Sequence, residues 1–118
     1  MTAKEQRRER LMPAGIPRYV RIYDNGGETF DRYTAIFTGR YAGRELGGCD
    51  YVGMSENPFH PQGYGQHGEA REVIDANRHG FTPAMGQKCR LGKRIPFDQL
   101  PEPCQQLVKQ DYRQLWGL

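Results

Sequence analysis

The chain has no long apolar run and no closely spaced cysteines. No stretch approaches the ~18 apolar residues that a membrane-spanning helix needs. Its three cysteines, Cys49, Cys89 and Cys104, are odd in number and lie far apart, without a CxxC pair. The charged start of the chain is not followed by the apolar segment of a secretory signal. These absences are typical of reduced thiols in a cytoplasm. We therefore expect a cytoplasmic protein (in the host cytoplasm if a phage encodes it) without a membrane partner.

The chain also lacks the short motifs that mark common catalytic and nucleotide-binding sites. It contains no GxxxxGK[ST] loop, no GxGxxG directly after a strand and no HExxH helix. It has no recognisable RRM, KH or helix-turn-helix pattern. These absences argue against P-loop enzymes, dinucleotide-binding folds and the common nucleic-acid-binding modules, and we predict no cofactor.

Apolar residues are scarce, whereas glycine and proline are abundant. Hydrophobic residues make up 36% of the 118, beside 15 glycines and 8 prolines. Thirteen aromatic residues argue against disorder and predict a small core with much loop. The length fits a single domain, residues 18–118, behind a basic N-terminal arm of residues 1–17. Because small folds often gain stability by association, we expect a homo-oligomer. The net charge of +3 permits an anionic partner but does not require one.

Alternation in residues 18–37 predicts an antiparallel β-hairpin. Val20 and Ile22 share one face of the first strand, and Asn25-Gly26 favours a tight turn. The chain returns as a strand over residues 29–37, whose inward face is Tyr33, Ala35 and Phe37.

Four further elements complete the prediction. We expect a strand over residues 50–55, a short helix over 69–79 and an edge strand over 91–97. A last helix starts within residues 98–101, and its apolar stripe is Cys104, Leu107, Val108, Tyr112 and Leu115. The predicted fold class is α+β: a small antiparallel sheet with an N-terminal β-hairpin and a C-terminal amphipathic helix packed on it.

The stretch from Met54 to Glu69 is the centre of this organisation. It contains two of the three histidines together with Pro58 and Pro61, and several glycines. Such a mixture disfavours regular structure and predicts a loop. The loop is either a binding surface or a crossing between two elements, and the sequence leaves both open.

Arginines and aromatic residues near this loop indicate a phosphate-bearing ligand. Guanidinium groups bind phosphate oxygens, and aromatic rings stack on bases. Amide side chains add donors and acceptors for a base edge. The candidate ligand-binding set is Asn57, Phe59, His60, Gln62, Tyr64, Gln66, His67, Arg40, Arg90 and Arg94. The alternative is that Phe59 and Tyr64 pin the loop to the core.

A metal and a catalytic pair are the remaining hypotheses for this loop. His60, His67 and Glu69 are suitable zinc ligands, although their spacing matches no sharp metal signature. Cys49 or Ser55 can be paired with a histidine, but neither lies in a catalytic signature. We therefore assign no catalytic residue and treat the protein as more consistent with a non-enzyme.

Three stretches together resemble small proteins encoded by bacteriophages and prophages. They are residues 23–34, residues 54–63 with 66–69, and residues 91–101. No assigned chemistry accompanies these proteins, so the resemblance transfers no site. Small phage proteins of this size often bind host components, and some block host defence by sequestering nucleotide signals or by capping a defence protein.

The resemblance and the candidate set lead to one expectation and two alternatives. We expect a non-enzymatic phage-type binding protein that captures a nucleotide or a nucleotide-derived signal and counteracts host defence. The first alternative is a protein–protein inhibitor or virion accessory factor that binds a host protein through the central loop and a sheet edge. The second is a small metal-dependent hydrolase that uses His60, His67 and Glu69.

Overall fold

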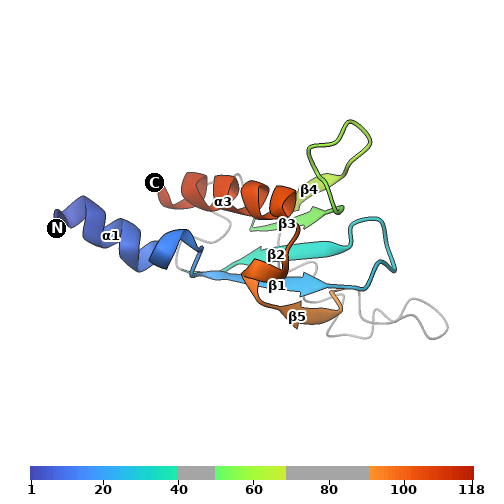
Figure 1. Cartoon of the computed structure of the whole chain (residues 1–118), viewed down its shortest axis with the longest axis horizontal. Coiled ribbons are helices and arrows are strands. Elements are labelled where there is room, and N and C mark those ends of the chain that lie inside the picture. The colour runs from blue at the N-terminus through green and yellow to red at the C-terminus, as the bar shows by residue number, and fades with distance from the viewer. Residues whose placement is uncertain (40–49, 69–90) are drawn as a thin grey trace.

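A five-stranded antiparallel sheet forms the body of the protein (Figure 1). This computed structural model describes residues 1–39, 50–68 and 91–118. The strand order is β4-β3-β2-β1-β5, and every neighbouring pair is antiparallel. The strands are β1 (Val20–Asp24), β2 (Tyr33–Phe37), β3 (Tyr51–Met54), β4 (Gly65–Gly68) and β5 (Lys93–Ile95). The predicted helix over 69–79 lies outside the described residues.

Two helices accompany the sheet, α1 (Ala3–Leu11) and α3 (Glu102–Trp116). Helix α3 lies along one face of the sheet, whereas α1 extends beyond the end of α3 (Figure 1). None of the helices in the described part of the chain is long and apolar enough to cross a membrane. The predicted α+β fold, with its C-terminal amphipathic helix, is confirmed.

The last helix begins later than the sequence predicts. Residues Phe97–Gln99 form a separate 3₁₀ turn, and Leu100 is extended with ψ 144°. Pro101 explains the break, because a proline disfavours the helical conformation in the residue before it. Helix α3 ends at Gly117, whose left-handed φ of 65° lets the last carbonyls be capped.

The hairpin forms with the predicted faces, but its turn is not tight. Ile22 lies opposite Ala35, and Val20 lies opposite Phe37. Strand β2 begins only at Tyr33, so residues 25–32 form a longer hairpin loop. The side chain of Asn25 explains the difference. Its Oδ1 accepts hydrogen bonds from the N–H groups of Gly27 and Glu28. Its Nδ2 donates to the Thr29 hydroxyl, so one side chain holds the longer loop.

Part of the predicted central loop is a strand. Ser55 and Tyr64 close the remaining loop, because the Ser55 N–H donates to the Tyr64 carbonyl at 2.9 Å. The Tyr64 N–H donates in return to Ser55 Oγ, also at 2.9 Å. The chain therefore reverses after β3 and pairs with it as β4, so the loop is confined to residues 55–64.

The main core lies between α3 and the sheet. Ala35, Val52 and Met54 are fully buried on the sheet side. They meet the predicted stripe of α3, in which Leu107 is partly buried and the others are buried: Cys104, Val108, Tyr112 and Leu115.

The N-terminal arm contributes to the same core. Leu11 and Met12 are buried in it. The Tyr112 hydroxyl donates to the Leu11 carbonyl at 2.6 Å and accepts from the Tyr19 N–H at 3.3 Å. One buried phenol thus joins the arm, the residue before the first strand and α3.

Candidate functional site

Two loops meet at one end of the sheet and enclose an open groove. The loops are the hairpin loop (residues 25–32) and the central loop (residues 55–64), and the groove measures about 620 Å³. Ligand pockets commonly fall between ~300 and ~1,000 Å³. We call this cavity the loop groove. It is lined by Gly27, Glu28, Thr29, Phe30, Arg32, Ser55, Glu56, Asn57, His60, Gln62 and Gly63.

Local hydrogen bonds give the central loop its shape. Asn57 Oδ1 accepts from the Phe59 N–H at 3.2 Å, and His60 Nδ1 accepts from the Gln62 N–H at 3.1 Å. The second bond makes Nε2 the protonated nitrogen of the neutral form of His60, which is part of the groove lining. Gly63 lies so close to the chain at Asn57 that a Cβ atom would sit 2.1 Å from its carbonyl oxygen.

The start of the central loop is tied to α3. The Cys104 thiol donates to the Ser55 carbonyl at 3.1 Å. Burial raises the pKa of Cys104 to about 12. A thiol with that pKa is a poor nucleophile at neutral pH. Ser55 is itself buried, and its hydroxyl accepts the Tyr64 N–H, so both side chains have structural roles.

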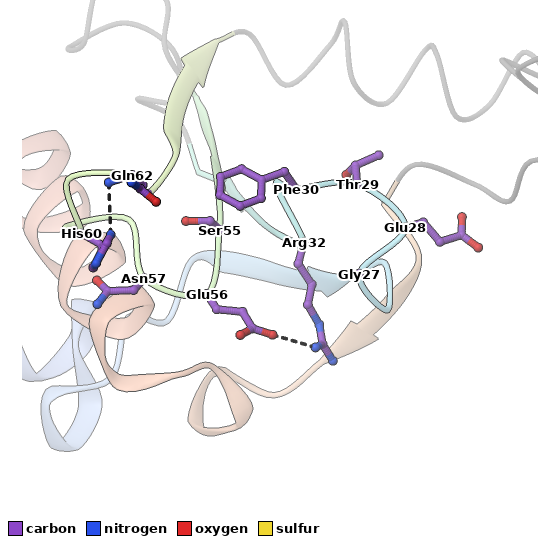
Figure 2. Close-up of a pocket in the computed structure, with 11 residues that line it drawn as sticks. Gly27, Glu28, Thr29, Phe30, Arg32, Ser55, Glu56, Asn57, His60 and Gln62 are labelled. Carbon is purple, nitrogen blue, oxygen red and sulfur yellow. Dashed lines mark hydrogen bonds and ion pairs between the residues drawn. The ribbon is translucent and has the colours of Figure 1, made fainter.

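An ion-pair network forms one wall of the loop groove. The Arg32 guanidinium contacts both carboxylate oxygens of Asp24, at 2.9 and 3.2 Å, and donates to Glu56 at 3.0 Å. The hydrogen bond from Arg32 lowers the pKa of Asp24, and the same bond raises the pKa of Arg32. Two carboxylates thus already neutralise this arginine. Figure 2 shows the Arg32–Glu56 pair crossing from one loop to the other.

Two exposed phenylalanines flank this end of the molecule. Phe30 is 67% exposed, and its ring centroid lies 6.4 Å from that of Tyr64 in an edge-to-face arrangement. Figure 2 shows the Phe30 ring standing between the two loops. Phe59, in the central loop, is 55% exposed. Phe59 therefore does not pin its loop to the core, and Tyr64 contacts Phe30 from the neighbouring loop.

The structure brings together only part of the candidate ligand-binding set. Asn57, His60 and Gln62 line the loop groove, and Phe59 and Tyr64 belong to the same loop. The remaining candidates lie elsewhere. Gln66 and His67 are on β4, Arg94 is on β5 at the opposite edge of the sheet, and Arg40 and Arg90 lie outside the described residues.

His67 has a different partner from His60. Its Nε2 lies 2.6 Å from Oδ2 of Asp111, a buried residue of α3. Burial raises the pKa of Asp111, and the bond to His67 opposes that shift. The pair fastens β4 to α3. Among the described residues, no three histidines, cysteines or carboxylates gather to hold a metal, and Glu69 lies outside them.

The sequence analysis missed Phe30 and Arg32. It assigned Asn25-Gly26 to a tight turn, which placed both residues within the second strand. The sequence offered one signal for a longer loop: Asn25, Gly26 and Gly27 precede Phe30, and turns made by an Asn side chain and by positive-φ glycines lengthen a hairpin loop.

The sequence of residues 63–68 also matches the pattern GxGxxG, yet residues 65–68 pair with β3 as strand β4. In a dinucleotide-binding fold those glycines form the turn into a helix.

Comparison of the chain with protein-family models, curated proteins and solved structures finds no match. The candidate site therefore has to be interpreted from its own geometry.

Proposed function

We propose that this chain is a non-catalytic binding protein that docks a basic, partly apolar segment of a partner protein in the loop groove. The observation that carries the proposal is the pair of exposed rings at one end of the sheet: Phe30, which lines the groove, and Phe59, which is exposed on the central loop outside that lining. Exposed aromatic side chains on structured loops are characteristic anchors of protein interfaces.

Rigid support favours docking over a purely structural role for these loops. Asn25 fastens the hairpin loop through its side chain, and the Ser55–Tyr64 bonds close the central loop. A binding surface that is already ordered loses less conformational entropy when a partner arrives. The two rings are therefore presented to the partner at low cost in ordering.

The charges of the loop groove favour a basic partner. Its described lining has two carboxylates, Glu28 and Glu56, and one guanidinium, Arg32. Arg32 is also held by Asp24 from outside that lining. An incoming phosphate would have to compete with the carboxylates of Asp24 and Glu56 for Arg32. A lysine or arginine side chain would instead be attracted by them and by the face of Phe30.

Nucleotide capture, the expectation from the sequence, is the second candidate. The observation that favours it is that polar side chains share the groove lining with Phe30: Asn57, Gln62 and His60. A nucleobase stacked on Phe30 would find donors and acceptors along its edge. The carboxylates around Arg32 weigh against the phosphate part of such a ligand.

Selection of peptides from a displayed random library on the immobilised protein would test the first candidate. We expect enriched peptides to combine basic with aromatic or aliphatic residues and to perturb amide NMR signals of residues 27–32 and 55–63. Phe30→Ala and Phe59→Ala should each weaken binding by roughly 1–2 kcal/mol while leaving the fold intact, because both rings are exposed. Ile16→Ala is the matched control, since Ile16 is exposed outside both loops.

Two outcomes would overturn the proposal. One is enrichment of peptides that bind the Phe30→Ala/Phe59→Ala variant as well as the unaltered protein. The other is the absence of any enriched peptide together with saturable shifts of residues 27–32 and 55–63 on titration with AMP. That second result would establish the nucleotide candidate in its place.

A further inference from the structure

Helix α1 is a charged surface that the proposed function does not use. All of its residues except Leu11 are exposed. Its basic residues are Lys4, Arg7, Arg8 and Arg10, and its acidic residues are Glu5 and Glu9. A helix that is polar all round gains little from packing on its own core. Exposure of this kind suits a helix that meets a charged partner.

The acidic side chains of α1 are engaged within the arm. The Thr2 hydroxyl donates to Glu5 Oε1 and accepts the Glu5 N–H, both at 3.1 Å. Glu9 Oε1 accepts the Ala14 N–H at 3.3 Å. Lys4 and Arg8 are four residues apart and share one side of the helix. The helix keeps a net positive charge, with four basic residues against two acidic ones, and Arg8 lines one cavity together with Glu5 and Glu9.

Helix α1 is held in place although it is short. An isolated helix of nine residues is marginal in water. Here Leu11 anchors its end in the core, and Arg7 Nη2 donates to the Trp116 carbonyl at 2.6 Å. The fold thus presents Lys4 and Arg8 on an ordered element.

The two ends of the molecule carry opposite charge. Figure 1 shows α1 at one end and the hairpin and central loops at the other. Among the described residues of the two loops and the strand ends next to them, four carboxylates outnumber two cations: Asp24, Glu28, Asp31 and Glu56 against Arg32 and Lys93. In α1 and the described residues next to it, six cations outnumber two carboxylates: Lys4, Arg7, Arg8, Arg10, Arg18 and Arg113 against Glu5 and Glu9. Opposite fields of this kind steer association and fix its orientation.

We propose that the basic side of α1 in one copy docks at the loop groove of a second copy. Lys4 and Arg8 would approach the Glu56 and Glu28 carboxylates, with one cationic head over the Phe30 ring. The inference rests on the proposed function, because it assigns the chain's own helix as one basic segment that the groove accepts, through charge alone since Leu11 is buried. The contact joins unlike surfaces, so it forms rings where the rotation closes and open chains where it does not.

Sedimentation velocity over a hundredfold range of protein concentration tests the inference. We expect association to grow with concentration at low salt and to fall when added salt shortens the Debye length to ~8 Å. Lys4→Glu/Arg8→Glu should weaken association by about tenfold or more, as should Glu28→Lys/Glu56→Lys; a factor of ten corresponds to ~1.4 kcal/mol.

The mixture of the two reversed variants is the decisive sample. Each variant alone has an α1 and a loop groove of like charge, whereas in the mixture every α1 finds a groove of opposite charge. Association should therefore return in the equimolar mixture. Asp98→Lys is the control for a change of net charge, because Asp98 is exposed in the 3₁₀ turn before α3. Thermal melts of every variant establish that the fold persists.

A wild-type protein that stays monomeric at every concentration in low salt would overturn the inference. So would association that survives either reversal or is not restored in the mixture. These results are separable from those on the proposed function. Monomers that still bind library peptides through Phe30 and Phe59 would refute only the self-docking, whereas charge-dependent assembly without peptide binding would refute only the partner segment.

Discussion

His67 and Asp111 form a hydrogen-bonded pair that their surrounding sequence does not predict. His67 lies in a glycine-rich stretch and Asp111 lies in a helix 44 positions later, and no sequence motif links the two. The fold buries Asp111 in the middle of α3 and supplies the imidazole of His67 as a hydrogen-bond partner for its carboxylate. A buried carboxylate that loses such a partner has a large desolvation cost.

We predict that His67→Ala destabilises the protein by roughly 1–3 kcal/mol, a value reduced from that of a fully buried pair because His67 is partly exposed. Urea unfolding followed by circular dichroism measures the change. In the Asp111→Asn background the same His67→Ala change should cost less, because no buried charge is left behind. Equal costs in both backgrounds would show that the pair contributes no coupling.

The raised pKa of Asp111 predicts a pH dependence. A carboxyl whose pKa is higher in the folded than in the unfolded state binds more protons when folded, between the two pKa values. Its contribution to the free energy of unfolding therefore falls as pH rises from its ordinary value of 3.8 through the raised value. The difference in unfolding free energy between the wild type and Asp111→Asn, measured at several pH values, should fall over that interval. A flat difference would contradict the prediction.

At the scale of elements, the central loop depends on the close approach of the backbone at Gly63 to the backbone at Asn57. The loop turns at Gly63, whose N–H donates to the His60 carbonyl at 2.7 Å. A side chain at this position would collide with backbone atoms, which cannot rotate away as a flexible side chain can. The shape of the loop groove therefore depends on a glycine in its own lining.

Gly63→Ala should accordingly destabilise the protein by roughly 1–3 kcal/mol, as overpacking typically does, and should shift the NMR signals of residues 55–64. Gly65→Ala is the matched control two residues later. Its Cβ would meet Leu107 at 3.5 Å, an ordinary van der Waals distance. A Gly63→Ala variant with unchanged stability and unchanged loop signals would refute the requirement for glycine.

At the scale of the whole molecule, the N-terminal arm and the sheet share a core. The sequence analysis separated residues 1–17 from residues 18–118, because the arm begins with a charged segment. The structure folds Leu11 and Met12 against the face of the sheet that α3 covers. The exposed part of α1 thus contributes to the surface, whereas Leu11 and Met12 contribute to the stability of the fold.

Leu11→Ala should lower the free energy of unfolding by roughly 2–5 kcal/mol, the range for truncating a buried leucine. Ile16→Ala, at an exposed site nearby in sequence, should change it by less than about 0.5 kcal/mol. Chemical denaturation of both variants checks the contrast. Similar small effects would mean that the arm is not part of the cooperative unit.

The sequence alone determined the elements whose pattern is local. Alternation of apolar residues marked β1 and β2, and the stripe from Cys104 to Leu115 marked α3, because each burial face repeats with the period of its own backbone. Prolines and glycines placed the central loop, although not its end. These patterns were enough to establish the α+β class.

Tertiary structure decided which loops and side chains meet. Antiparallel pairing brought residues 25–32 beside residues 55–64, placed Arg94 at the far edge from His67, and set His67 against Asp111. Such contacts depend on strand order and register, which no short stretch of sequence encodes. The local pattern therefore predicted the sheet and its covering helix, whereas the groove, its neutralised arginine and its exposed rings followed only from how distant segments pack.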